Sequence, residues 1–529
     1  ISPTQKGTVY LGAQYLFRTR DFGQTWERIS PDLTTNDPEK QKQEESGGVT
    51  VDNSFAEMHT TIYAISESPK DPAVIWVGTD DGNLQVTRDG GKTWSNVVAN
   101  IAGLPKNAWV SSVEAGHFDA GTVYATFDLH TFGDMQPYAY SSSDYGKTWQ
   151  PLIKPDGGVR GFAHVIKEDL VNPRLLFLGT EFGLWVSLDG GAAWAQYKGA
   201  EFPAVAVRDM AIHPRDCDLV IATHGRGIWI IDDVTPLRNL TPETLSARAS
   251  FVEGRPVAQR IPAFGGWVNG DAAFVGPNAP DDAVITYYQQ KRHIFGDMKI
   301  EVFDSAGKLV DTLPTAKRRG LSRVTWSMRM PPPRVPTAAS AAGGAFLGPR
   351  LLPGTYTVKM TKDQDVYETK LAVVADPRSR HTEADRKAQF DLAVRLYRLL
   401  GEMTDVVDRM NRVRAGLDSS AAKLPAKDAL APRLRAASTA VDELRKKIVA
   451  TKEGGMITGE ERLREFLAEL YGNVANYEGR PSDTQVQRAD ALARELADVT
   501  REFEAWSTKE LPPINKALAQ KNAGKVGTE

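Results

Sequence analysis

The sequence has a single cysteine, Cys217, among 529 residues. One thiol excludes an internal disulfide and any metal site that needs several thiolates. Because isolated cysteines are most often buried as small apolar residues, we expect Cys217 to lie in the core of its domain. The sequence also lacks the P-loop, the H-E-x-x-H zinc motif and the G-x-S-x-G nucleophile motif. No cofactor and no metal site are therefore predicted.

The sequence has no large excess of charge of one sign and no long apolar run. Lys and Arg number 64 and Asp and Glu number 67, so no basic surplus is available to neutralise the phosphates of nucleic acid. No apolar stretch approaches the roughly 20 residues that cross a bilayer, and no membrane span is expected. The first residue is Ile1 and no signal region follows it, so we expect further sequence upstream.

The sequence does contain a repeat. Four octapeptides share the pattern Ser/Thr-x-Asp-x-Gly-x-x-Trp. In such a segment the Asp can bond to backbone N–H groups of a turn, the Gly allows positive φ, and the Trp supplies a large apolar anchor. We therefore predict four hairpin turns, each pinned into a sheet. Their structural residues are Asp21, Gly23 and Trp26; Asp89, Gly91 and Trp94; Asp144, Gly146 and Trp149; and Asp189, Gly191 and Trp194.

Strand pairs precede these octapeptides, as at residues 74–86 and 175–186, and residues 219–233 repeat the pair without an octapeptide. Five units result, each of which is typical of a β-propeller blade, so residues 1–240 are predicted to form propeller blades. The first unit has almost no sequence for its innermost strand. Since an open ring leaves unpaired edges, we expect missing N-terminal blades, or another chain, to complete it.

The rest of the chain changes character twice, which predicts a multidomain protein. After a linker over residues 241–280, alternating strands at 281–376 predict an Ig-like β-sandwich with a mobile Pro/Ala/Gly-rich loop at 331–349. Apolar residues then recur at three- and four-residue steps. They predict a four-helix bundle over 382–510, beginning at a capping pair of Thr382 and Asp385, and a frayed tail over 511–529.

Residues 1–240 resemble the Asp-box (BNR) propellers of sialidases, xyloglucanase-type glycosidases and the sortilin luminal domain. The phrases VIWVGTDDGNLQVTRDGGKTW, LLFLGTEFGLWVSLDGG and HGRGIWIIDD are similar to those of large bacterial proteins described as glycosyl hydrolase-like or sortilin-like. The resemblance implies additional N-terminal blades, an Ig-like domain, a helical end, and a periplasmic or extracellular location. It is specific for the fold and nearly silent on function.

Antiparallel pairing places the octapeptide turns at one end of the blades and the Gly-Thr-Asp-type turns at the other. We interpret the octapeptide aspartates as structural, because local turns account for them. The opposite rim carries four carboxylates that could act as acid and base in glycoside cleavage if two lay about 5–10 Å apart. They are Asp80, Asp81, Asp128 and Glu181. Further candidates for binding are His130, Asp134, His224, Arg226, Glu57 and His59.

Each of these residues also has a structural explanation, since Asp residues hold tight turns and Arg226 can pair with a neighbouring carboxylate. Sialidase chemistry is disfavoured, because only Arg208 and Arg226 could grip a carboxylate. The leading hypothesis is a binding or scaffold protein whose rim holds a protein, a peptide or a glycan. The competing hypotheses are a glycoside hydrolase that uses the rim carboxylates, and a structural subunit with an apolar contact on its open edge.

Overall fold

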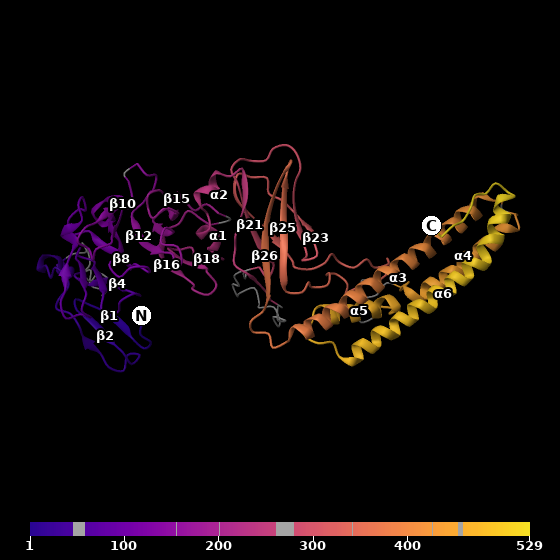
Figure 1. Ribbon diagram of the computed structural model, residues 1–529, viewed down its shortest axis with the longest axis horizontal. Coiled ribbons are helices and arrows are strands. Elements are labelled where there is room, and N and C mark those ends of the chain that lie inside the picture. Colours follow the sequence, from indigo (N-terminus) through magenta and orange to yellow (C-terminus); the bar gives the residue numbers. More distant parts are fainter. Residues whose placement is uncertain are drawn as a thin grey trace. The chain divides into compact units, whose positions relative to one another are not determined.

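The computed structural model describes residues 1–45, 59–154, 156–199, 202–260, 280–340, 342–425, 427–452 and 459–528. The chain divides into two compact units, Ile1–Pro242 and Glu243–Glu529. The first unit consists mainly of antiparallel sheets, and the second contains two further sheets and the long helices (Figure 1). The predicted order, from β-structure to a helical C-terminal region, is confirmed.

Five antiparallel sheets, named A to E here, follow one another along the first unit, and in each the strands pair in chain order. Short 3-10 turns lie at Pro38–Lys40, Gln43–Glu45, Val98–Asn100 and His130–Phe132 (η4). The strands are β1 (Val9–Gly12), β2 (Leu16–Thr19) and β3 (Glu27–Arg28) in sheet A; β4 (Ile62–Glu67), β5 (Ile75–Thr79), β6 (Leu84–Thr87) and β7 (Ser95–Asn96) in B; β8 (Trp109–Ala115), β9 (Val123–Leu129), β10 (Asp134–Ser142) and β11 (Gln150–Pro151) in C; β12 (Ala163–Glu168), β13 (Leu176–Thr180), β14 (Gly183–Ser187) and β15 (Ala195–Gln196) in D; and β16 (Val207–Ile212), β17 (Leu219–Thr223) and β18 (Ile228–Ile231) in E.

Adjacent sheets pack face to face. The first strands of sheets B to E contact one another in order, and apolar clusters fill the spaces between successive sheets. Within the described residues, sheet A lacks the inner strand that begins sheets B to D, and sheet E lacks their outer strand. This series agrees with the predicted β-propeller in its coarse form, and in the described part of the chain no strand pairing joins sheet A to sheet E.

Glycines on β1 of sheet A and on β13 of sheet D let neighbouring sheets approach closely. A Cβ atom built on Gly12 would lie 2.6 Å from Ile62 Cγ2, and one built on Gly179 would lie 2.7 Å from Val207 Cγ1. Atoms at that distance overlap, so only glycine fits without a shift of the neighbouring strand. Ile62 and Val207 both belong to the first strand of the next sheet. The close approach of sheet A to B and of sheet D to E therefore depends on a glycine facing a β-branched residue.

The octapeptide turns are held by their own carboxylates. Asp89 accepts hydrogen bonds from Thr87 Oγ1 at 2.8 Å, from Thr93 N at 2.9 Å and from Thr93 Oγ1 at 2.6 Å. Trp94 Nε1 donates to Ile29 O of the preceding sheet at 3.2 Å. Asp21 and Asp144 have the same three kinds of donor, and Asp189 has two of them.

From these hydrogen bonds we predict that the stability provided by the Asp144 turn depends on pH. Hydrogen bonds from Thr148 and Ser142 lower the pKa of Asp144 to about 2, below its ordinary value of about 4. The stabilisation is therefore fully present above about pH 4 and is lost as the pH falls towards 2. We expect Asp144→Asn to lower the Tm of the first unit by roughly 2–4 °C at pH 7. Thermal unfolding of the unchanged protein and of the Asp144→Asn variant is measured from pH 7 to pH 2. The difference in Tm should shrink below pH 4, and a constant difference would contradict the prediction.

A short helix, α1 (Thr235–Arg238), ties the end of sheet E back to sheet D. Arg238 Nε and Nη2 donate to the carboxylate of Asp169, which directly follows β12, at 2.8–3.0 Å. Arg238 Nη1 lies 3.1 Å from Cys217 Sγ. The expectation of a core cysteine is wrong, because Cys217 is half-buried in a turn with φ of 59° beside this guanidinium. A second short helix, α2 (Pro242–Ser246), follows.

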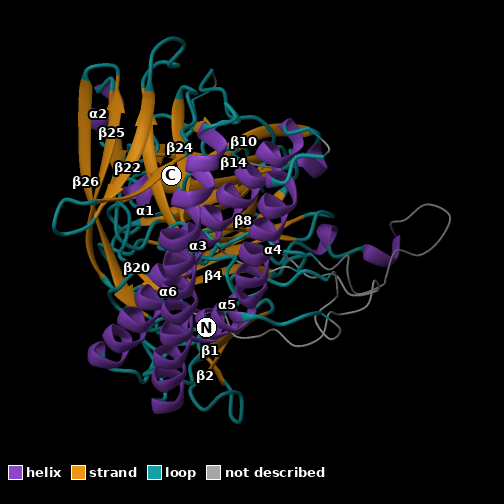
Figure 2. Cartoon of the chain, turned by 90° about the vertical axis from the view of Figure 1, so that its right-hand side faces the viewer, coloured by secondary structure: helices purple, strands orange, loops and turns teal. Residues whose placement is uncertain are grey.

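The second unit begins with a β-sandwich. Its two sheets share one apolar core around Trp326 and Tyr287, and Figure 2 shows the long strands β22, β25 and β26 side by side. The linker predicted at 241–280 is wrong in part, because two strands of three and four residues, too short to show alternation, belong to the sandwich. The sheets are β19 (Ala249–Val252), β21 (Ala283–Gln289) and β24 (Gly320–Trp326); and β20 (Val257–Gln259), β26 (Asp365–Ala375), β25 (Gly354–Lys362), β22 (Met298–Phe303) and β23 (Leu309–Leu313).

Two long helices, α3 and α6, are joined by two shorter ones that each contact both. The predicted cap is confirmed, since Thr382 Oγ1 accepts from Asp385 N and the Asp385 carboxylate accepts from Thr382 N. The frayed tail predicted at 511–529 is wrong, because Ile514 and Leu518 are buried in the helical core. The helices are α3 (Glu383–Lys423), α4 (Leu430–Ile448), α5 (Leu463–Ala475) and α6 (Asp483–Ala519).

In its described residues, 331–340 and 342–349, the Pro/Ala/Gly-rich segment contacts the helices, whereas its composition predicts a mobile loop. Ala342 and Ala345 are buried in the helical core, and Tyr471 Oη of α5 donates to Leu347 O at 2.6 Å. Small side chains allow this close contact between an extended segment and a helix. The composition that suggested mobility is thus a packing requirement.

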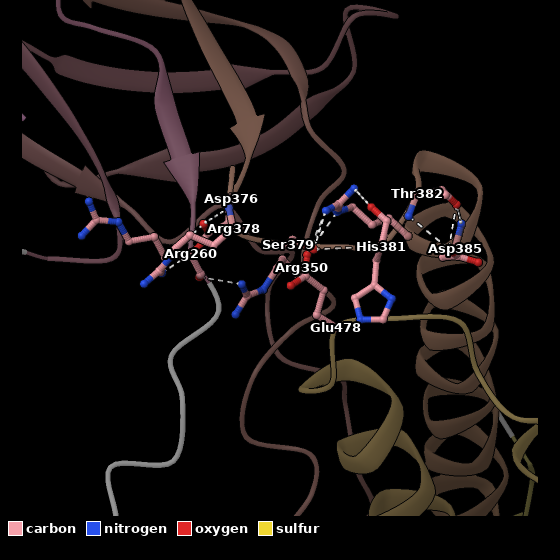
Figure 3. Close-up of polar contacts among 10 residues, drawn as sticks. Arg260, Arg350, Asp376, Arg378, Ser379, His381, Thr382, Asp385 and Glu478 are labelled. Atoms are coloured by element: carbon pink, nitrogen blue, oxygen red, sulfur yellow. Dashed lines mark hydrogen bonds and ion pairs between the residues drawn. The ribbon is translucent and has the colours of Figure 1, made fainter. Parts of the chain in front are cut away.

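The connection from β26 to α3 is also held by polar contacts (Figure 3). Asp376 accepts from Arg378 Nε and Nη2 at 3.0 and 2.7 Å. Arg386 of α3 donates to His381 O at 2.7 Å and pairs with Glu478 at 3.1 Å. A charged network therefore fixes the seven residues between the last strand of the sandwich and the helices.

Candidate functional site

The candidate site is the end of the first unit opposite the octapeptide turns, named the rim here. The turns between the second and third strands of sheets B to E meet the starts of the first strands there, because strands within each sheet alternate in direction. Thr61 N and Thr61 Oγ1, before β4, both donate to the Asp80 carboxylate after β5 at 2.8 Å. The rim therefore collects residues that are distant in the sequence.

Asp80 and Asp81 are engaged in holding the chain. Burial raises the pKa of Asp80 above its ordinary value although both of its oxygens accept bonds from Thr61. Asp81 is 1% exposed and accepts from Thr35 N and Thr35 Oγ1 at 2.7 and 2.6 Å, and from Thr79 Oγ1 at 2.5 Å. Both carboxylates are bonded to other parts of the chain, and each ties two segments together.

Asp128 orients a histidine. It is 3% exposed, and its Oδ1 accepts from the backbone N of His130 at 2.8 Å and lies 2.7 Å from His130 Nδ1. Because an ionised carboxylate only accepts hydrogen bonds, the proton of a neutral His130 ring lies on Nδ1. The ring stacks on Phe162, with centroids 4.4 Å apart and planes inclined by 13°. Asp128 thus fixes the orientation of an aromatic stack between sheets C and D.

His164 lies between a carboxylate and a guanidinium. Its Nδ1 is 3.2 Å from Arg208 Nη1 and its Nε2 is 3.1 Å from Glu181 Oε2. Burial lowers the pKa of His164 below its ordinary value, so the ring is neutral at pH 7. Since a guanidinium can only donate, Nδ1 accepts from Arg208 and Nε2 carries the proton that is donated to Glu181. Phe162 meets the same ring edge to face at 4.6 Å.

These contacts form a continuous polar and aromatic ladder across three sheets. It runs from Asp128 and His130 through Phe162 to His164, and then to Glu181 and Arg208. Glu181 and Arg208 are its accessible end, with side chains 30% and 41% exposed. The ladder combines hydrogen-bonding groups at a surface with a buried support that holds them in one orientation.

The other predicted rim residues are not part of this ladder. Asp134 holds the chain locally through Gln136 N and Tyr138 Oη. His59 Nδ1 lies 3.8 Å from Asp80 Oδ2. The side chains of His224 and Arg226 are exposed in the turn between β17 and β18, and Glu57 lies outside the described residues.

Exposed aromatic rings flank the ladder at the rim. Phe132, at the end of η4, is 68% exposed, and Phe182, directly after Glu181, is 50% exposed. Tyr63, near the start of β4, is 57% exposed and packs edge to face on Trp109 at 4.7 Å. Beside hydrogen-bonding groups, such rings can pack on the apolar face of a ligand.

Sequence reasoning did not identify Phe162 or His164 as site residues. Both lie at the beginning of β12, and the argument that selected Glu57 and His59 applies equally to them. Arg208, considered only for sialidase chemistry, is the second residue of β16, the first strand of sheet E. Across the described residues, no three His, Cys, Asp or Glu side chains lie together in a way that could hold a metal.

The comparisons with known proteins find partial similarity to two curated xyloglucanases. No family model matches the chain. A probable oligoxyloglucan-reducing end-specific xyloglucanase of Neosartorya fischeri is 25% identical over 269 residues, or 46% of this chain and 32% of the relative. The oligoxyloglucan-reducing end-specific xyloglucanase of Emericella nidulans is 23% identical over 274 residues, or 45% of this chain and 32% of the relative.

Among solved structures, the xyloglucanase of Xanthomonas campestris is 14% identical and has a TM-score of 0.32; the match covers 44% of this chain and 35% of that one. The chain spans about a third of the length of the curated relatives it matches. Their names are compatible with the glycoside-hydrolase hypothesis. None of the helices in the described ranges has the length and apolar character needed to cross a membrane.

Proposed function

We propose that the rim binds a glycan chain. The observation that carries the proposal is the ladder from Asp128 to Arg208, flanked by the exposed rings of Phe132 and Phe182. Sugars offer apolar faces that pack on aromatic rings and hydroxyl groups that bond to carboxylates and guanidinium groups. Both curated relatives carry the name xyloglucanase, so xyloglucan is the first glycan to test.

Binding is favoured over cleavage by the state of the candidate carboxylates. Glycoside cleavage needs two carboxyl groups available to one bond, about 5–10 Å apart. Of the four candidates, Asp80, Asp81 and Asp128 are buried or nearly so, and their oxygens accept bonds from the protein. Glu181 alone among the four is substantially exposed. These carboxylates therefore suit support and recognition better than an acid and base pair.

The test is calorimetric titration of the protein with xyloglucan oligosaccharides. We expect binding, and we expect Phe182→Ala to weaken it about tenfold, which corresponds to roughly 1.4 kcal/mol for the loss of one ring contact. Glu181→Gln should weaken binding by a similar factor, since the amide loses the charge that accepts a sugar hydroxyl. Phe118→Ala is the matched control, because Phe118 is 41% exposed and follows β8 at the opposite end.

Three results would overturn this proposal. Equal loss of affinity in the Phe118 and Phe182 variants, or no binding of any member of a broad glycan panel, would remove the rim as a glycan site. Turnover of a polysaccharide that Asp128→Asn abolishes without loss of folding would replace binding with glycoside hydrolysis. A glycan ligand also fits the periplasmic or extracellular location that the resemblance implies.

A further inference from the structure

One end of the sandwich carries an exposed apolar turn. Ile294 and Phe295 lie in the connection from β21 to β22, and they are 67% and 85% exposed. The pairing of β21 with β24 and of β22 with β25 brings the connections at 290–297, 314–319 and 363–364 to this end. It is opposite to the end from which β26 leads to α3. An exposed apolar patch that is rimmed by polar residues is typical of an interaction site.

The turn that carries this pair is held in place by its neighbours. His293, which is 6% exposed, anchors its start, and the backbone N of His293 donates to Lys317 O at 3.0 Å. Lys317 Nζ donates to Gly296 O at 3.1 Å at the end of the turn. Gly296 has a φ of 86°, which favours glycine and lets the chain reverse here. Since contacts on both sides fix the turn, Ile294 and Phe295 need little further ordering when they bind a partner.

Five exposed cations surround the apolar pair. They are Lys291, Arg292, Lys317, Arg318 and Arg319. Among the residues that the structure describes, none of the five forms an ion pair. Carboxylates are fewer in and beside the same connections. They are Asp297, Asp363 and Asp365, and the last of these pairs with Arg248 at 2.6 Å. The apolar turn therefore stands in a positively charged surface.

We propose that this end of the sandwich binds the surface of a bilayer of anionic phospholipids. Ile294 and Phe295 enter the boundary between headgroups and acyl chains, and the five cations face the headgroup phosphates. An isoleucine beside the ring favours a bilayer over a soluble polyanion, because a polyanion offers charges alone and a bilayer offers an apolar layer beneath its charges. The attachment is peripheral and reversible, since two apolar side chains bury far less area than a spanning helix.

The test is flotation of the full chain with phospholipid vesicles. We expect vesicles of phosphatidylcholine and phosphatidylglycerol in equal parts to bind the protein about tenfold more strongly than vesicles of phosphatidylcholine alone. Phe295→Ser is expected to lower binding to the anionic vesicles about tenfold, because a buried ring is lost. Arg318→Gln and Arg319→Gln are each expected to lower it about fivefold. At about 1 M salt, which screens charges beyond about 3 Å, binding should fall to the level seen with phosphatidylcholine alone.

Phe346→Ser and Lys308→Gln are the matched controls. Phe346 is 67% exposed and precedes β25, and Lys308 is exposed in the turn between β22 and β23. Neither residue lies at the end that carries the apolar turn, so neither change is expected to alter vesicle binding. All of the substituted side chains are exposed, and circular dichroism and thermal unfolding check that each variant is folded.

Other outcomes contradict the proposal. No binding to the anionic vesicles, or equal binding to both kinds of vesicle, would exclude an anionic bilayer as the partner. Losses in the Phe346 and Lys308 variants as large as those in the Phe295 and Arg318 variants would exclude this end of the sandwich. A loss in the arginine variants with none in Phe295→Ser, together with binding to heparin, would identify a site for a soluble polyanion instead. The rim belongs to the first unit, so these results and those on glycan binding are independent.

Discussion

Replacing Arg238 with alanine is expected to lower the free energy of unfolding of the first unit by about 3–5 kcal/mol. The guanidinium makes three bonds to the Asp169 carboxylate, and the exposed fractions of the two side chains are 8% and 0%. Without Arg238 a buried carboxylate loses its countercharge, which costs more than the pair itself contributes. Denaturant unfolding followed by tryptophan fluorescence measures the effect, since eight of the 11 tryptophans precede residue 234.

The control for this experiment is Arg215→Ala. Arg215 pairs with Asp216, but its side chain is 81% exposed, so solvent screens the charge and the expected change is within about 0.5 kcal/mol. Losses of equal size in the Arg238 and Arg215 variants would show that the Asp169 pair does not hold α1 against sheet D.

Gly179→Ala is the second change with a large expected effect, a loss of about 1–3 kcal/mol. The new methyl group would lie 2.7 Å from Val207 O, from Val207 Cγ1 and from Val165 Cγ1. A backbone oxygen cannot turn away as a side chain can, so sheets D and E must separate to accept the group. The same denaturant experiment measures the loss, and the crystal structure of the variant should show sheet E shifted from sheet D.

Gly354→Ala is the matched control. Gly354 is also a strand residue, but a Cβ atom built on it has no other atom within 4 Å. It is expected to leave the free energy of unfolding unchanged or slightly raised, since alanine restricts the unfolded chain more than glycine does. A loss at Gly354 equal to that at Gly179 would mean that strand propensity, and not the contact between sheets, sets the cost.

The repeated part of the fold could be predicted from the sequence, because the same local contacts recur and leave the same residue pattern each time. Each octapeptide holds its own turn, as the bonds of Asp89 to Thr87 and Thr93 illustrate, and such contacts between near neighbours leave a pattern in the sequence. The helical stripes gave the long helices for the same reason. The burial of Ala342 and Ala345 could not be predicted, because they pack in a core formed with helices far along the sequence, as the bond from Tyr471 to Leu347 illustrates.

In the candidate site, too, local features could be predicted from the sequence and contacts between distant residues could not. The turn aspartates could be found from their spacing, but their hydrogen-bond partners could not. Asp81, for example, accepts a hydrogen bond from Thr35, 46 residues earlier. The ladder depends on pairs such as His164 with Arg208, which are 44 residues apart and meet only because sheets D and E are neighbours. Single residues at strand starts carry no local signal of such partners.

The two ends of the first unit differ in how well they should tolerate substitution. At the octapeptide end, each residue named in the pattern holds the turn or its contact with the preceding sheet, as Asp89, Gly91 and Trp94 do. Substitution there is therefore expected to lower the free energy of unfolding. At the other end the exposed residues differ from sheet to sheet, from Glu181 to His224, upon strands that are nearly alike. A change in one of these turns would therefore alter the groups that the rim presents without altering the framework that carries them.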